Sequence, residues 1–127
     1  MSNNKLYLTF NDICRDIKLI KDQIHNSNKK YDAILTISGG GLIPSRLLRT
    51  YLNIPVYSVG ISFYIGEEMQ KKPVIFQWLR DEEFEFLKDK HVLIVDELSD
   101  TMGTLNLLVN QLVDKGFSSE NLGIAVL

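Results

Sequence analysis

The sequence has one cysteine, Cys14, among its 127 residues. A single thiol excludes an internal disulfide framework and a zinc site built from several cysteines, and it suits a reducing compartment, so we expect a cytoplasmic protein. An excess of positive charge is also missing, because 14 basic residues oppose 16 acidic ones for a net charge of -2. The chain therefore has no general electrostatic attraction to nucleic acid or to an anionic membrane, and any phosphate site must be local.

Long apolar runs are absent as well. No run approaches the ~18 residues of a membrane span, and residues 1–10 lack both a basic-then-apolar signal pattern and a small-residue cleavage site. We therefore expect neither export nor membrane insertion. Only two histidines occur, His25 and His91, and neither lies near another metal-ligand residue at a useful spacing. We assign both to structural or surface roles.

What the sequence does contain is typical of a globular protein, with 45% apolar and 24% charged residues. Its length predicts one domain over residues 1–127. Apolar residues at helical spacing predict three helices. The first covers residues 11–26, the second begins after Gly41 and ends near Leu52, and the third contains Leu105 and ends at Lys115-Gly116. Continuous apolar runs predict strands over residues 33–38, 56–61, 73–78, 91–95 and 122–127.

Strands and helices alternate along the chain, which predicts an α/β fold with a mainly parallel sheet of four or five strands covered on both faces. Residues 81–90 are expected to form a short helix or turn, and residues 64–72 are the most loop-like stretch. Exposed apolar residues around Phe84 and Phe86 suggest a homodimer surface. Trp78 either faces a ligand site or fills the core.

A run of three glycines, Gly39-Gly40-Gly41, lies between a predicted strand and a predicted helix. Unpaired amides at the helix N-terminus can bind an anion there, and glycine lets the anion approach the backbone closely. Alone the run is weak evidence, because glycines also serve tight turns and close packing.

The segment from His91 to Leu105 is more informative. A buried strand runs directly into two carboxylates, Asp96 and Glu97, which belong at the carboxyl edge of the sheet because ions are costly in apolar surroundings. The turn Asp100-Thr101-Met102-Gly103-Thr104 then opens another helix with hydroxyls and free amides. Two anion sites on either side of an acidic pair suit a ligand with phosphate at both ends and hydroxyls or a divalent cation between them. The alternative is that the turn only caps the helix and the acidic pair is solvated.

These two motifs resemble the type I phosphoribosyltransferases, and most closely the fungal hypoxanthine-guanine and xanthine branch. In that branch a glycine run precedes Leu/Phe-Ile-Pro, as in residues 39–44, and Asp-Glu-x-x-Asp-Thr-x-x-Thr follows later, as in residues 96–104. The resemblance extends from about Tyr7 to Leu127. It implies the core fold of the family and a reaction of 5-phosphoribosyl-1-pyrophosphate (PRPP), held with Mg²⁺, with a purine base to give a nucleoside 5'-monophosphate and pyrophosphate in purine salvage.

The resemblance also implies roles for single residues. Asp96 and Glu97 would contact the ribose hydroxyls and Mg²⁺, directly or through water. Gly39 and Gly40 would receive the pyrophosphate. The 5'-phosphate would be held by the turn after the acidic pair, which consists of Asp100, Thr101, Met102, Gly103 and Thr104. Asp100 also matches the general acid/base near the attacking base nitrogen, and Ser62 and Tyr64 match the start of the mobile loop that closes over the reacting centre.

The sequence departs from the family in two places. Many relatives carry Arg or Lys where Gly39 stands, although the fungal branch shares the glycine. In addition, the chain stops at Leu127, before the lysine and the ring-stacking aromatic that contact the base in the purine enzymes, so the part of the fold that covers the base is incomplete. The early stop leaves open a non-catalytic PRPP- or nucleotide-binding module. A receiver-like signalling domain with acidic residues at its strand ends is a further alternative, which the phosphate-type turn after Asp96-Glu97 disfavours.

Overall fold

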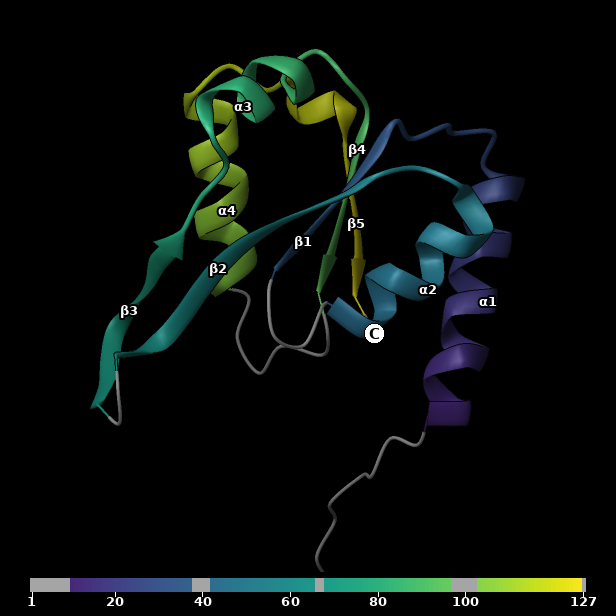
Figure 1. The fold of residues 1–127 in the computed structure, drawn as a ribbon, viewed down its shortest axis with the longest axis horizontal. Helices are drawn as coiled ribbons and strands as arrows, with labels where there is room; N and C mark the ends of the chain where they lie inside the picture. Colours follow the sequence, from purple (N-terminus) through teal and green to yellow (C-terminus); the bar gives the residue numbers. More distant parts are fainter. Residues whose placement is uncertain (1–9, 38–41, 66–67, 97–102, 127) are drawn as a thin grey trace, which may run out of the picture.

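The computed structural model describes residues 10–37, 42–65, 68–96 and 103–126. Within these ranges the chain alternates between helices and strands (Figure 1). The elements are α1 (Phe10–Asn26), β1 (Ala33–Ile37), α2 (Leu42–Leu52), β2 (Val56–Ile65), β3 (Glu68–Gln77), α3 (Asp81–Leu87), β4 (Val92–Asp96), α4 (Gly103–Asp114), a 3-10 turn (Ser119–Asn121) and β5 (Leu122–Val126). The order and type of the predicted elements are thus confirmed.

The five strands form one sheet in the order β3-β2-β1-β4-β5. Strand β1 is parallel to both β2 and β4, and β4 is parallel to β5. Only β3 runs antiparallel, paired with β2. The predicted mainly parallel sheet of an α/β fold is therefore confirmed.

The expectation for residues 64–72 is wrong. The described part of this stretch belongs to a long β2–β3 hairpin, with Tyr64 opposite Met69 and Ile65 opposite Glu68. The charged residues of this stretch interrupt the apolar run by which strands were recognised in the sequence. An antiparallel ribbon need not be buried on both faces, so it tolerates polar side chains that a central parallel strand does not.

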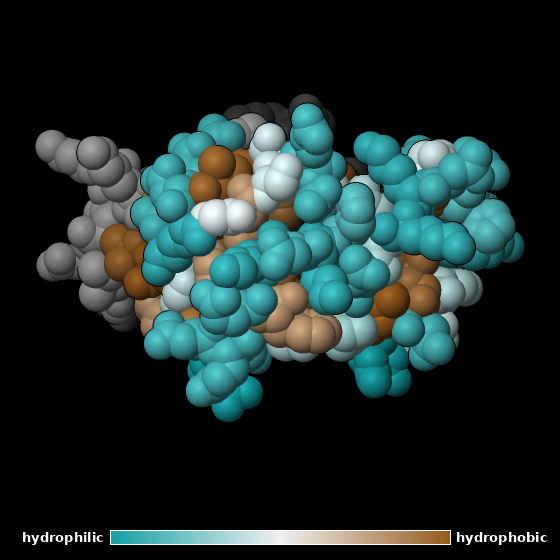
Figure 2. Space-filling view, turned by 90° about the horizontal axis from the view of Figure 1, so that it is seen from above, coloured by the Kyte–Doolittle hydropathy of each residue, from teal (hydrophilic) through white to brown (hydrophobic). Residues whose placement is uncertain are grey.

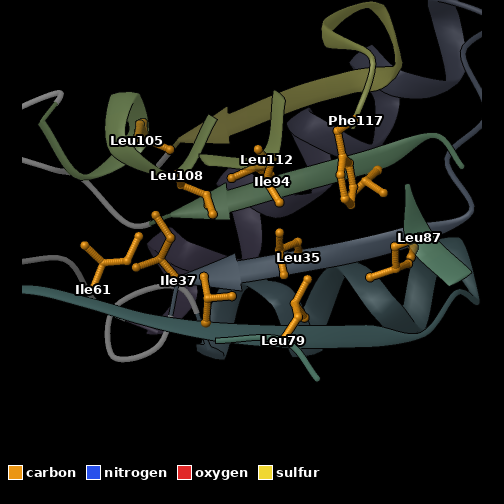
Figure 3. Packing of buried hydrophobic residues seen from close by; sticks show 13 residues of the cluster. Leu35, Ile37, Ile61, Leu79, Leu87, Ile94, Leu105, Leu108, Leu112 and Phe117 are labelled. Atoms are coloured by element: carbon orange, nitrogen blue, oxygen red, sulfur yellow. The ribbon is translucent and has the colours of Figure 1, made fainter. Parts of the chain in front are cut away.

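Hydrophobic clusters cover both faces of the sheet because side chains alternate along each strand. In β1, Ala33, Leu35 and Ile37 pack on the face covered by α3 and α4, whereas Ile34 packs on the face covered by α1 and α2. Figure 3 shows the first cluster, in which Leu35 and Ile94 of neighbouring strands lie near leucines of α4. Burying each such side chain stabilises the fold by about 1.5–3 kcal/mol.

The two aromatic residues of α3 have different environments. Phe84 packs against the first cluster and meets Phe117 in an edge-to-face contact with 5.0 Å between ring centroids. Phe86 is 53% exposed. The expectation that both are exposed is therefore wrong for Phe84, because the ring is needed to close the core between α3 and the end of α4. Among the helices in the described ranges, none has the length and apolarity to cross a membrane.

Candidate functional site

The two central strands, β1 and β4, mark the point where the chain reverses its direction across the sheet. From β1 the chain passes through α2 to β2 on one side, and from β4 it passes through α4 to β5 on the other. Helix α2 lies on the α1 face of the sheet and α4 on the opposite face (Figure 1). Ligands of open α/β sheets bind at this kind of switch point, beyond the carboxyl ends of the strands.

Asp96 is the last residue of β4 and lies at this edge of the sheet. It pairs with Val126 of β5 in the parallel register and is only 8% exposed. By strand alternation it shares the face of Val92 and Ile94, which is the face covered by α4. Asp96 therefore lies at the carboxyl end of a central strand but is buried there, and its role in binding a ligand stays a prediction.

Gly103 and Thr104 form the beginning of α4. The first turn of a helix has backbone N–H groups without intrahelical partners, and the helix dipole favours negative charge there. Thr104 is half-buried. The structure thus places Gly103 and Thr104 in the first turn of a helix, and their assignment to the 5'-phosphate stays a prediction.

Several predicted site residues lie outside the described residues. They are Gly39, Gly40, Glu97, Asp100, Thr101 and Met102. The described residues on either side of them are the ends of β1 and β4 and the starts of α2 and α4. Pro44 is the third residue of α2, in the first turn, where its missing N–H removes no helical hydrogen bond.

Ser62 and Tyr64 both lie in β2, not in a loop. Strand β1 pairs with β2 only as far as Val59, so the later residues of β2 continue past the sheet centre on the side where β1 and β4 end. Figure 1 shows the hairpin extending on that side. The two residues are thus brought to the predicted edge of the sheet, on a paired ribbon.

Two buried polar residues near this edge were not predicted. The Thr36 hydroxyl in β1 donates to the Val95 carbonyl of β4 at 3.4 Å. Ser45 in α2 is fully buried, and its Oγ has no hydrogen-bond partner in the described part of the chain. The sequence signal for Thr36 was a hydroxyl residue within an otherwise apolar strand. For Ser45 the signal was a small polar residue directly after Pro44.

Other candidates lie away from this edge. Trp78 packs beside the first cluster, and Lys115 Nζ lies 5.5 Å from its ring centroid. Lys115 follows the end of α4, so Trp78 lies at the opposite end of the sheet and fills the core. Arg46 of α2 donates to Thr50 Oγ1 at 2.8 Å on the exposed face of that helix.

No group of three or more His, Cys, Asp or Glu side chains comes together within the described ranges to hold a metal. Mg²⁺ does not need such a cage, because proteins usually bind it through one or two carboxylates with water and substrate phosphates. Asp96 supplies a hard oxygen donor at the switch point. The donor set therefore fits Mg²⁺ carried by a phosphorylated ligand.

A family model described as the phosphoribosyl transferase domain matches residues 7–127. The chain is 35% identical to xanthine phosphoribosyltransferase 1 of Saccharomyces cerevisiae, over 87% of this chain and 61% of the yeast protein. It is 33% identical to the hypoxanthine-guanine phosphoribosyltransferase of the same yeast, over 87% of this chain and 56% of that protein. The chain thus spans less than two thirds of the length of these curated relatives.

Two solved structures are also similar. The purine phosphoribosyltransferase of Pyrococcus horikoshii has a TM-score of 0.78 and 33% identity, covering 98% of this chain and 78% of that one. A hypothetical protein from Neisseria gonorrhoeae, solved with bound ppGpp, has a TM-score of 0.85 and 37% identity, covering 100% of this chain and 72% of that one.

Proposed function

Since the chain belongs to the phosphoribosyl transferase domain family, we propose that it transfers the 5-phosphoribosyl group of PRPP to a purine base. Hypoxanthine, guanine and xanthine are the proposed bases, and purine salvage in the cytoplasm is the proposed role. The observation that carries the proposal is the switch point between β1 and β4, where buried Asp96 lies between two strand-to-helix connections. The names of the relatives support the same substrate class.

The proposed reaction forms a bond between a base nitrogen and the anomeric carbon of the ribose while the bond from that carbon to pyrophosphate breaks. The base nitrogen loses its proton, and Asp100 is the proposed acceptor. Positive charge grows on the ribose as the pyrophosphate leaves, so the protein must mainly position both partners and stabilise charge.

Each end of PRPP has a proposed binding segment. Gly103 and Thr104 at the start of α4, with Asp100, Thr101 and Met102, hold the 5'-phosphate through amides and hydroxyls. The other end, the pyrophosphate, binds at Gly39 and Gly40, which connect β1 to α2. Because α2 and α4 cover opposite faces of the sheet, one sugar phosphate spans the switch point between them.

Between these ends, Asp96 and Glu97 accept hydrogen bonds from the ribose hydroxyls. The same carboxylates would hold Mg²⁺, directly or through water, and the metal would screen the negative charge of the pyrophosphate. The β2–β3 hairpin with Ser62 and Tyr64 is proposed to cover the reacting centre and exclude water.

Asp96→Asn tests this proposal. The protein is incubated with PRPP, Mg²⁺ and each purine while nucleoside monophosphate is followed. We expect turnover in the unaltered chain and a loss of about 10²-fold or more in kcat/KM in the variant, the size found when one electrostatic contact to a transition state is removed. Asp114→Asn, at the exposed end of α4, is the matched control and should retain full turnover. Equal turnover in Asp96→Asn contradicts the assignment.

A second candidate function is nucleotide binding without transfer. The observation that favours it is the bound ppGpp in the structure of the Neisseria gonorrhoeae protein to which this chain is similar. On this candidate, calorimetry with Mg²⁺ would give PRPP or ppGpp binding that Asp96→Asn weakens, while no nucleoside monophosphate forms with any purine. Robust turnover excludes the candidate.

A further inference from the structure

A cavity of about 530 Å³ lies at the edge of the sheet opposite the switch point. Its walls are the last turns of α1, the turn that leads into β1, and the end of α2, which together contribute Lys21, His25, Lys29, Lys30, Tyr31 and Tyr51. The volume falls within the range of about 300–1,000 Å³ that small-molecule sites occupy. Figure 2 views the molecule from this edge, which is mostly hydrophilic.

The lining of the cavity is positively charged, and Lys29 and Lys30 also line a neighbouring cavity that contains Asp32 and Glu120. Three lining residues of the first cavity are lysines, and none of its lining residues is Asp or Glu. Lys21 forms an ion pair with Asp22, with 3.4 Å between Nζ and Oδ1. Lys29 and Lys30 form no ion pair within the described ranges. Lysine ammonium groups without carboxylate partners favour a phosphate.

Two tyrosine rings complete the lining. Tyr51 is 50% exposed, and Lys21 Nζ lies 5.6 Å from its ring centroid. Tyr31 is half-buried, with its hydroxyl against Gly123 of β5. Burial raises the pKa of the Tyr31 hydroxyl. Aromatic rings beside cations suit a ligand that carries a flat aromatic group as well as phosphate.

A simpler role for the lysines is to compensate the negative carboxyl ends of α1 and α2. Lys21 lies more than one turn before the end of α1 at Asn26, outside the reach of the helix dipole. Lys29 and Lys30 follow Asn28, whose positive φ of 59° ends the helix, so they lie beyond its last turn. That role also does not require a hollow between the cations and the tyrosines.

We propose that this cavity binds a purine mononucleotide, with the phosphate on Lys29 and Lys30 and the base against Tyr51. The site is separate from the proposed PRPP site, because its lining comes from residues that precede β1 and end α2. Nucleotide binding in this cavity is a property additional to phosphoribosyl transfer and does not depend on that activity.

The test is a titration of the isotope-labelled full chain with GMP, followed by the amide resonances in NMR. We expect saturable shifts at Lys29, Lys30 and Tyr31, with weaker shifts from guanosine or inorganic phosphate alone. Lys29→Gln/Lys30→Gln should raise the dissociation constant at these residues about tenfold or more, a change of 1.4 kcal/mol for each factor of ten. Shifts at Gly103 and Thr104 from binding at the PRPP site should persist.

Two further variants keep the result interpretable. Tyr51→Ala removes the ring without changing charge and should also weaken binding at the cavity, whereas Lys18→Gln, on α1 outside the lining, should not. The proposal is overturned by unshifted resonances at Lys29 and Lys30 up to about 10 mM GMP, or by equal shifts with phosphate alone. It is also overturned if the double variant binds GMP normally. Turnover with PRPP is measured separately, so either proposal can fail alone.

Discussion

Tyr31 and Gly123 hold the turn after α1 against strand β5. A side-chain carbon on Gly123 would overlap the Tyr31 hydroxyl and ring. The nearest atoms are the hydroxyl end of the Tyr31 ring, so an added carbon would have to displace that ring. Glycine at position 123 therefore allows the Tyr31 ring to approach the backbone of β5 closely.

Gly123→Ala should lower the free energy of unfolding by about 1–3 kcal/mol, the usual cost of forcing extra volume into a packed site. Urea denaturation measures the change. When Tyr31→Ala is already present, the same substitution should cost much less, because the overlapping atoms are gone. Equal costs in both backgrounds would show that the overlap is not the cause.

Helix α4 connects the hydrophobic core with the proposed phosphate site. Its first residues, Gly103 and Thr104, lie at the proposed phosphate site, while Leu108 and Leu112 are fully buried against the sheet. The core thus fixes the direction in which the helix N-terminus points.

Leu108→Ala should lower the free energy of unfolding by about 2–5 kcal/mol, since it removes buried atoms and leaves a cavity. Val113→Ala on the same helix is the control, because Val113 is 41% exposed. It should change stability by about 0.5 kcal/mol or less. Both are read from urea denaturation, and similar losses in the two variants would mean that α4 does not pack as described.

The β2–β3 hairpin can be shortened without removing its pairing with the sheet. Ser62 pairs with Val74, so replacing residues 63–73 with Asn-Gly leaves a two-residue turn between them. We expect the fold to persist and turnover with PRPP to fall about tenfold or more, because the cover over the reacting centre is lost. Full turnover in this variant would rule out a role for Tyr64.

For the whole molecule, the metal is expected to serve the substrate and not the fold. The described ranges contain no three-ligand cluster that could act as a structural metal site. Treatment with EDTA should therefore stop phosphoribosyl transfer and leave the urea midpoint unchanged, and added Mg²⁺ should restore transfer. A lower midpoint after chelation would contradict this.

A homodimer stays a prediction for the whole molecule. Phe86 at 53% exposure is the apolar residue of α3 that such a surface would cover. Light scattering should give twice the chain mass of 14.5 kDa, and Phe86→Ser should lower the fraction of dimer. A monomer at all concentrations contradicts the prediction.

The sequence was informative where burial is complete. The central strands β1 and β4 are buried at every position, so their apolar runs were clear, and a carboxylate that ended one run marked the edge of the sheet. The hairpin was missed because the charged residues between positions 64 and 72 obscure the alternation of a strand. The packing of Phe84 depends on Phe117, which is distant in sequence, so local pattern could not show it.

The cavity at the opposite edge was not predicted for a similar reason. Its residues come from α1, the following turn and the end of α2, and no motif connects them in sequence. Local rules identified each element, but only packing brings the lysines and tyrosines together.

The central pairing also determines the order in which this chain acquires structure. Thr36 and Val95, on neighbouring strands, are 59 residues apart, while the β2–β3 hairpin pairs residues close in sequence. Loop closure over long separations is slow, whereas hairpins form within microseconds. During synthesis, β1 can pair with β2 before β4 has emerged from the ribosome, so we expect the β1–β4 pairing that makes the switch point to form after the β1–β2 pairing.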